Sequence, residues 1–397
     1  MLIAGAILLS LPFVLGLYAY LLYPALLRIV ASRRSQRSVR LGAAPGAGAQ
    51  PLVTIVVPAY NEAHQIGETI QALLAQDYPG ERRQILVLSD ASTDRTDDIV
   101  LEFAGQGVEL LRLPGRSGKT AAENASLPLI RGSIVINTDA SVRLHPSAVR
   151  LLVEAMADPT VGVASTRDVS VASTYAANRA EGSYVGYEMG IRALETASGG
   201  IVGASGSGYA IRTELHRVRV RDDLSRDFSS ALTAERHGFR AISVEAAICY
   251  VPRSQSLRRE YRRKVRTISR GMETLYFNRE LLNPITHGAF AWKLWSHKVC
   301  RWLVPISGVP AALGVILVSV AVPAASGALL VVATLAALAV AGATWPDERA
   351  VPGWLHSGVL GVLSANLAVV HSAWRFFHGH QDHVWEPTRR AAPSVAP

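Results

Sequence analysis

Two short apolar runs in the sequence each end at a single aspartate. They occupy residues 84–90, QILVLSD, and residues 133–139, SIVINTD. Such runs are typical of buried parallel strands, and the ligands of open α/β sheets bind outside the carboxyl ends of these strands. A hard cation such as Mg²⁺ or Mn²⁺ prefers oxygen ligands, and one carboxylate can suffice when substrate phosphates and water fill the other positions. The pattern predicts a site for an anionic ligand and a cation at Asp90 and Asp139, although a strand-end aspartate can also cap a helix.

Two neighbouring turns could contact a nucleotide. The turn PAYNE at 58–62 follows an apolar strand and can place its amide and carboxylate side chains against a base or ribose, or can simply join strand to helix. In the turn SDASTD at 89–94, Asp94 complements the positive end of the next helix, which leaves Asp90 for a ligand. Together the two turns favour a nucleotide pocket.

A glycine-rich loop precedes a lysine. The segment GRSGKT at 115–120 is similar to a phosphate-binding loop, but the full motif needs a glycine where Leu113 stands. The loop also follows the third predicted strand and not the first, so we do not expect a nucleotide hydrolase. Lys119 remains as a positive charge near a helix N-terminus, suited to a diphosphate or only to solvent.

Segments of alternating strand and helix character must position these side chains. The alternation is typical of an α/β fold, a mostly parallel sheet with helices on both faces. A glycine-rich loop follows at 198–208. The predicted strands are residues 52–57, 84–88, 108–113 and 133–137, and the predicted helices are residues 63–75, 93–105, 121–131, 147–157 and about 174–196.

The composition indicates a soluble domain with membrane anchors. The chain has 397 residues, of which 49% are hydrophobic and only 18% charged. Residues 2–27 form one apolar run without signal-peptide features. At about 1.5 Å per residue this run is long enough to cross a hydrocarbon core of roughly 30 Å. The two cysteines give no disulfide framework and no metal motif, which fits a reducing cytoplasm.

Basic residues indicate which side of the membrane the domain occupies. Five arginines follow the first apolar run, namely Arg28, Arg33, Arg34, Arg37 and Arg40. Flanks rich in Lys and Arg mark the cytoplasmic side, so the N-terminus is expected outside and the middle of the chain inside. Much of the formal charge of +9 lies at 28–40 and 253–270, which fits lipid headgroups and a diphosphate substrate better than a nucleic acid.

The C-terminal part predicts an interfacial helix followed by membrane segments. After residue 252, apolar residues and arginines recur at helical spacing on two different faces, as in a helix that lies at a bilayer surface. Apolar segments follow at about 302–322, 326–344 and 354–374. Three crossings would leave the basic tail outside, so either the tail breaks the positive-inside tendency or one segment does not cross.

Seven short motifs occur in an order that resembles glycosyltransferase family 2, the inverting enzymes with a GT-A fold. They are PAYNE at 58–62, SDASTD at 89–94, GKTAAEN at 118–124, DAS at 139–141, GSGYAIR at 206–212, RDF at 226–228 and RRKVR at 262–266. The last three resemble the branch of membrane polysaccharide synthases, which includes cellulose, chitin, hyaluronan and poly-N-acetylglucosamine synthases. Each motif is weak alone, and the ordered set is specific. The resemblance covers roughly residues 50–275.

On the donor side, the resemblance implies a nucleotide-sugar site with a divalent cation. The residues that would contact the donor are Pro58, Tyr60, Glu62, Asp90, Lys119, Asp139, Arg263 and Arg266. The first four would line the nucleoside, and the next two would face the diphosphate and an Mg²⁺ or Mn²⁺ ion for which Asp139 is the metal ligand. The two arginines would stabilise charge on the departing nucleoside diphosphate, or would only face lipid.

On the acceptor side, the resemblance implies a glycine-rich wall and a catalytic base. Gly206, Ser207, Gly208 and Arg212 would shape the acceptor side. Asp227 would be the base, which is needed because an acceptor hydroxyl loses its proton as it attacks the anomeric carbon. Asp227 could instead merely cap the helix that follows it.

Three departures from the family pattern bear on function. Arg226 replaces the first acidic residue of the usual acidic pair, Ser141 replaces the second aspartate of Asp-x-Asp, and residues 263–267 lack the glutamine and tryptophan of the Gln-x-x-Arg-Trp element. Because cellulose-type processivity is associated with the missing residues, sugar transfer is better supported than long-chain synthesis. The departures also leave open a catalytically silent binding module of an export complex.

The expected function is that of an inverting glycosyltransferase. It would move a sugar from a nucleotide-diphosphate donor, UDP-linked, to a glycan hydroxyl at the cytoplasmic face of the cell membrane, in extracellular or cell-envelope polysaccharide synthesis. A polyprenyl-phosphate or other lipid acceptor is not excluded. Four spans are few for a closed channel, so translocation of a polymer would need an export partner or an oligomer, and no nucleic acid is expected as a partner.

The predicted organisation has one catalytic domain between membrane segments. The predicted parts are a transmembrane anchor at 1–27, a basic flexible linker at 28–50, the GT-A domain at 51–252, basic amphipathic interface helices at 253–300, a transmembrane region at 301–375 and a tail at 376–397.

Overall fold

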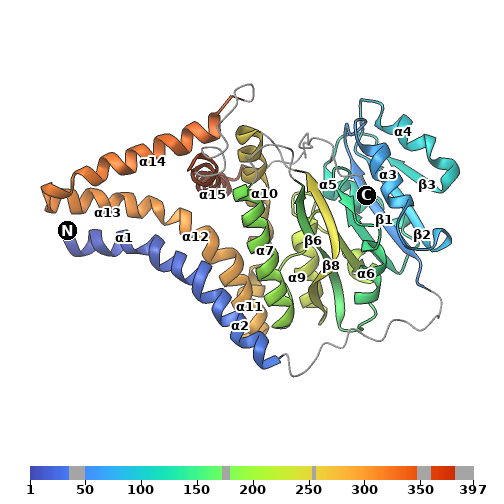
Figure 1. Cartoon of the computed structure of the whole chain (residues 1–397), viewed down its shortest axis with the longest axis horizontal. Coiled ribbons are helices and arrows are strands. Elements are labelled where there is room, and N and C mark those ends of the chain that lie inside the picture. The colour runs from blue at the N-terminus through green and yellow to red at the C-terminus, as the bar shows by residue number, and fades with distance from the viewer. Residues whose placement is uncertain (35–49, 172–178, 253–255, 347–358, 381–397) are drawn as a thin grey trace. The chain divides into compact units, whose positions relative to one another are not determined.

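The apolar strand segments form one eight-stranded sheet (Figure 1). Its strands are β1 (Val53–Ala59), β2 (Arg83–Ser89), β3 (Val108–Arg112), β4 (Ile134–Thr138), β5 (Arg143–Leu144), β6 (Val161–Val171), β7 (Gly208–Arg212) and β8 (Arg240–Pro252). Their order in the sheet is β3-β2-β1-β4-β7-β6-β8-β5. The computed structural model describes residues 1–34, 50–171, 179–252, 256–346 and 359–380.

Strand pairing brings the chemically important turns to one edge of the sheet. β1 is parallel to both β2 and β4, and Ala59 at the end of β1 lies opposite Ser89 at the end of β2. β7 is antiparallel to β4, with Thr138 opposite Gly208, so the loop that enters β7 meets the residue that follows β4. The mostly parallel α/β sheet predicted from the sequence is therefore confirmed.

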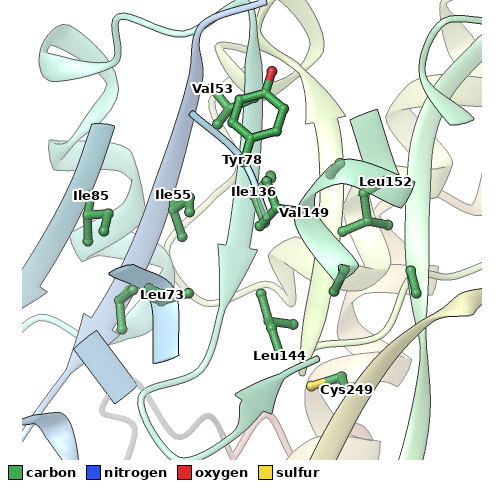
Figure 2. Packing of buried hydrophobic residues seen from close by; sticks show 14 of the residues in the cluster. Val53, Ile55, Leu73, Tyr78, Ile85, Ile136, Leu144, Val149, Leu152 and Cys249 are labelled. Atoms are coloured by element: carbon green, nitrogen blue, oxygen red, sulfur yellow. The ribbon is translucent and has the colours of Figure 1, made fainter. Parts of the chain in front are cut away.

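Helices cover both faces of this sheet. They are α3 (Ile66–Leu74), α4 (Thr96–Glu102), α5 (Lys119–Ala125), α6 (Ala148–Ala155), α7 (Arg179–Ala197), α8 (Thr213–His216) and α9 (Arg226–Arg236). Because side chains alternate along a strand, Ile55 and Val57 of β1 join one apolar cluster with α3 and α6 (Figure 2), whereas Val56 joins another with α5 and α9. Each large apolar side chain fully buried in these clusters stabilises the fold by about 1.5–3 kcal/mol.

The described chain divides into two compact units, and the second unit consists of helices. They are α1 (Leu2–Leu17), α2 (Tyr23–Arg34), α10 (Leu257–Phe277), α11 (Pro284–Leu294), α12 (Arg301–Ile306), α13 (Gly308–Ala321), α14 (Gly327–Thr344) and α15 (Gly361–Phe377). α1 and α13 pack closely where Gly5 faces Gly314. A Cβ atom added at Gly5 would lie only 3.0 Å from the carbonyl oxygen of Gly314. Small residues at such a contact are typical of helices that associate within a membrane.

Three helical segments in the described part of the chain are long and apolar enough to cross a membrane. They are Leu2–Arg33, Pro284–Ala321 and Pro323–Thr344, one N-terminal and two C-terminal. These segments agree with the predicted membrane helices that flank a soluble domain. α10 has the predicted amphipathic pattern, since it buries Val265, Met272 and Leu275 on one face.

Of two predicted membrane segments, one belongs to a longer helix than predicted and the other lies partly outside the described residues. The helix that contains the predicted anchor continues past residue 27, as α2, to Arg34. The predicted crossing at 354–374 begins outside the described residues, and its remaining part overlaps α15. Arg37, Arg40, the segment 41–49 and the tail from residue 381 also lie outside the described residues, and the predicted domain boundaries stay predictions.

Gly132 is predicted to be essential for the stability of the sheet. A Cβ atom at this position would lie 2.5 Å from the backbone nitrogen of Thr54 in β1, so Gly132→Ala must push two backbone segments apart. We expect a loss of about 1–3 kcal/mol of unfolding free energy, seen as a lower Tm of the detergent-solubilised protein. Gly80→Ala is the matched control, because no atom lies within 4 Å of its added Cβ. An equal Tm for the two variants would contradict the prediction.

Candidate active site

Asp90 organises the loop that leads to Lys119. Its two carboxylate oxygens accept hydrogen bonds from the backbone amides of Ser117, at 2.7 Å, and Gly118, at 2.8 Å. Gly118 has a φ of +93°, a conformation that favours glycine, and Lys119 begins α5 directly after it. Asp90 therefore fixes the point at which α5 starts. Whether this carboxylate also contacts a nucleoside stays a prediction.

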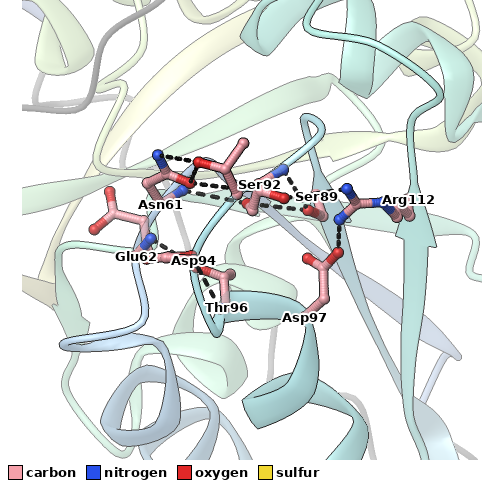
Figure 3. Close-up of polar contacts among 9 residues, drawn as sticks. Asn61, Glu62, Ser89, Ser92, Asp94, Thr96, Asp97 and Arg112 are labelled. Atoms are coloured by element: carbon pink, nitrogen blue, oxygen red, sulfur yellow. Dashed lines mark hydrogen bonds and ion pairs between the residues drawn. The ribbon is translucent and has the colours of Figure 1, made fainter.

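A hydrogen-bond network joins the turn after β1 to the turn after β2 (Figure 3). Asn61 adopts a φ of +52°, and its side-chain oxygen accepts a hydrogen bond from the amide of Thr93 at 2.8 Å. Asp94 accepts hydrogen bonds from the amides of Thr96 and Ala63. Burial alone would raise the pKa of the Asp94 carboxyl, but the hydrogen bonds from Thr96 and Ala63 lower it. The network holds the two turns at fixed positions beside the ends of β1 and β2. We call this end of the sheet the ligand edge, because ligands of such sheets bind there.

The other predicted nucleoside residues lie in or beside the first turn. Pro58 belongs to β1 and is buried. The guanidinium carbon of Arg116 lies 3.7 Å from the centre of the Tyr60 ring, a cation–π arrangement. Glu62 is buried, and its carboxylate accepts a hydrogen bond from the side chain of Gln65. The structure thus places Tyr60 at the ligand edge next to an arginine that sequence reasoning did not select.

Lys119 and Asp139 lie in direct contact. The Lys119 ammonium donates a hydrogen bond to Asp139 Oδ1 at 2.6 Å and lies 3.5 Å from the carbonyl oxygen of Gly206. Burial alone would lower the pKa of Lys119, but the nearby carboxylates of Asp139, Glu123 and Asp227 raise it above its usual value. The ammonium therefore stays charged and offers a fixed positive charge to an anionic ligand.

Asp227 lies beside the same point. It occupies the first turn of α9, and a Cβ atom added at Gly206 would lie only 2.7 Å from its Oδ2. Its Oδ1 accepts a hydrogen bond from the hydroxyl of Ser225. Three elements, the end of β4, α5 and α9, therefore bring Asp139, Lys119 and Asp227 together around the backbone of Gly206.

Residues 203–208 are held by side chains that sequence reasoning missed. Buried Arg192 donates hydrogen bonds to the hydroxyl of Ser165 and to the carbonyl of Gly203. Asp168 accepts a hydrogen bond from the Ser205 hydroxyl at 2.6 Å. Arg192 lies on α7 and Asp168 lies on β6. Neither segment has a recognisable motif, so only the fold could have identified these two residues.

The predicted acceptor residues divide into two groups. The carbonyl of Ser207 accepts a hydrogen bond from the hydroxyl of Thr138, so Gly206, Ser207 and Gly208 lie beside the end of β4. Arg212 does not belong with them and its predicted acceptor role is not supported. It ends β7 opposite Ile134, at the other edge of the sheet, and its guanidinium donates to the backbone carbonyls of residues 156, 158 and 161.

The two arginines of the predicted leaving-group site belong to the helical unit. Both lie on α10, where Arg263 forms an ion pair with Glu260 three residues earlier. Their contact with a donor stays a prediction.

Asp139 is the carboxylate predicted to bind a divalent cation at the ligand edge. Among the described residues, no group of three or more His, Cys, Asp or Glu side chains could hold a metal ion by itself. Asp139 is partly exposed, with its Oδ1 paired to Lys119. Such a carboxylate fits a cation that takes one protein ligand and fills its other positions with substrate phosphates and water.

Comparisons with known proteins show which family and which fold this chain is similar to. The profile described as glycosyl transferase family 2 matches residues 54–218. A curated relative from Synechocystis, beta-monoglucosyldiacylglycerol synthase, is 32% identical over 188 residues, which are 44% of this chain and 39% of the relative. The chain thus spans about two fifths of the length of this relative.

A solved structure has a similar fold over nearly the whole chain. It is a mannosyltransferase from Pyrobaculum calidifontis in complex with GDP-Man and Mn²⁺, with a TM-score of 0.68 and 23% identity. The similarity covers 93% of this chain and 99% of that chain. At this identity it shows the fold alone, a GT-A fold.

Gly206 is predicted to set the position of the Asp227 carboxylate. The added methyl group in Gly206→Ala would overlap Asp227 Oδ2 and displace it. We expect kcat for any reaction that uses this carboxylate to fall by about 10²-fold, because a displacement of about 1 Å is enough for such a loss. Gly105→Ala, with no atom within 4 Å of the added Cβ, should keep the kcat of the unsubstituted protein. Equal kcat in both variants would refute this assignment.

Proposed function

Since residues 54–218 match the profile of glycosyl transferase family 2, we propose that the chain transfers a sugar from a nucleoside-diphosphate donor to an acceptor hydroxyl, with inversion at the anomeric carbon. One observation carries this proposal. Lys119, Asp139 and Asp227, from three different elements, lie around Gly206 at the ligand edge of the sheet. A cation for the leaving group and a base for the nucleophile are thereby present at one place.

Asp227 would act as the base. The acceptor hydroxyl attacks the anomeric carbon as its proton passes to the Asp227 carboxylate, and the bond between that carbon and the diphosphate oxygen breaks. The hydroxyl attacks opposite the leaving group, so the product has the inverted configuration. The hydrogen bond from Ser225 to Oδ1 leaves Oδ2, beside Gly206, to accept the proton.

Lys119 would stabilise the departing nucleoside diphosphate. Its charged ammonium stays within hydrogen-bond distance of Asp139, so the positive charge is in place before the diphosphate develops its extra negative charge. A divalent cation bound to Asp139 and the diphosphate would supply further charge neutralisation when present. We also propose that Arg263 and Arg266 contribute to the same leaving-group charge.

The donor and acceptor classes rest on separate arguments. We propose a UDP-linked sugar as the donor and a glycan hydroxyl as the acceptor, in extracellular or cell-envelope polysaccharide synthesis at the cytoplasmic face of the cell membrane. The arginines after the first span and three candidate spans support this multi-pass orientation. A lipid hydroxyl is the second candidate acceptor, because the Synechocystis relative is named as a diacylglycerol glycolipid synthase.

The central test uses membranes that contain the protein and a panel of radiolabelled UDP-sugars and GDP-mannose. We expect at least one donor to label a product, and Asp227→Asn to lower transfer at least about 10²-fold while leaving donor affinity nearly unchanged. Partition of the product into organic solvent would identify a lipid acceptor. Asp158→Asn, at an ion pair with Arg240, is the matched control and should transfer normally. Normal turnover by Asp227→Asn would rule out its role as the base.

Asp139 is predicted to carry the metal dependence of donor binding. In Asp139→Ala, calorimetry should show that UDP binds with the same affinity with and without Mn²⁺, whereas Mn²⁺ should strengthen binding to the unsubstituted protein. Asp77→Ala, which removes an exposed aspartate that pairs with Arg150, should retain the full Mn²⁺ effect. A Mn²⁺ effect of normal size in Asp139→Ala would show that other groups bind the cation.

A further inference from the structure

Arg226, which stands where the family pattern has an acidic residue, is buried at the start of α9. It is only 4% exposed, and its guanidinium contacts two other elements. One nitrogen donates to the carbonyl of His216 at the end of α8, a second donates to the side chain of Asn124, and Nε lies 3.5 Å from Glu123 Oε2. The arginine therefore connects α9 to α5 next to the residue proposed as the base.

Glu123 is the charged partner on α5. It is 1% exposed and follows Lys119 by one helical turn. Burial raises the pKa of the Glu123 carboxyl, while the positive charges of Lys119 and Arg226 lower it. Two cations thus act on one buried carboxylate, and one of these cations is the residue proposed to face the diphosphate.

Further hydrogen bonds tie α5 to the segment before α9. The Thr120 hydroxyl donates to the carbonyl of Leu224 at 2.8 Å, and the Asn124 amide donates to the carbonyl of Val220 at 2.6 Å. The ion pair is thus the charged part of a wider connection between two elements. One of these elements carries Lys119 and the other carries Asp227.

We propose that the ion pair between Glu123 and Arg226 is a positioning pair, which fixes the Lys119 ammonium relative to the Asp227 carboxylate. The inference rests on the proposed function of those two residues. Without Arg226, Lys119 is the remaining cation of the two that act on the buried carboxylate of Glu123. We then expect the Lys119 ammonium to shift away from Asp139 and toward Glu123. Without Glu123, a buried guanidinium loses its counter-charge, and the start of α9 must shift to hydrate it.

This pairing gives the arginine a role that is compatible with catalysis. The basic residue is matched by a buried acid on α5, since Arg226 Nε lies 3.5 Å from Glu123 Oε2. Arg226 is therefore no argument for a catalytically silent module.

The test is a double-mutant cycle on the full chain in detergent, with Glu123→Leu, Arg226→Met and the double variant. The affinity of UDP in the presence of Mn²⁺ and kcat per binding-competent site are measured, with competence taken from calorimetric stoichiometry. We expect each single variant to weaken UDP binding at least about fivefold and to lower kcat at least about tenfold. The double variant, with an uncharged apolar pair, should recover both values to within about threefold of the original.

Arg240→Met is the matched control, since it removes an ion pair with Asp158 in the same unit. It should change neither value. Single variants that lower only Tm or stoichiometry, or losses that simply add in the double variant, would overturn the inference. If the unsubstituted protein turns over no donor, the proposed function fails, and the UDP affinities alone decide whether the pair is coupled to the site.

Discussion

The contact between the Lys119 ammonium and the Asp139 carboxylate is the interaction on which the site depends. It joins the start of α5 to the end of β4, at 2.6 Å, and it lies beside the carbonyl of Gly206. A partly buried ammonium keeps its charge only if nearby carboxylates compensate for its lost hydration. Asp139, Glu123 and Asp227 provide this compensation, so the ammonium that would bind a diphosphate is already held in place by the fold.

The aspartates at the strand ends share this edge but have unequal tasks. Asp90 uses both oxygens on the amides of the loop before α5, and so acts on Lys119 through the backbone. Asp139 contacts the lysine directly and has one oxygen shared with it. Asp227 belongs to neither strand, and it reaches the edge because α9 starts against the backbone of Gly206. Chain topology, and not proximity in sequence, creates the constellation.

The sequence was sufficient to predict the mostly parallel sheet and the position of Asp90 and Asp139 at the ends of two of its strands, because apolar runs and their terminal residues have a local pattern. It was insufficient where partners are distant. The amides that Asp90 binds, and the pairing of Glu123 with Arg226, depend on packing between elements without a shared motif. Arg212 was misplaced because β7 runs antiparallel to β4, which carries the end of the motif to the opposite edge.

The shared Asp139 carboxylate constrains how a cation could enter the site. Its Oδ1 is paired with Lys119, and the described residues offer no cluster of acids that would hold a metal ion by themselves. A cation held by one carboxylate must take most of its ligands from water or phosphate. The diphosphate and the cation would then stabilise each other's binding, and the positive charge would be greatest when a donor is present. Lys119 supplies the part of that charge that is permanent.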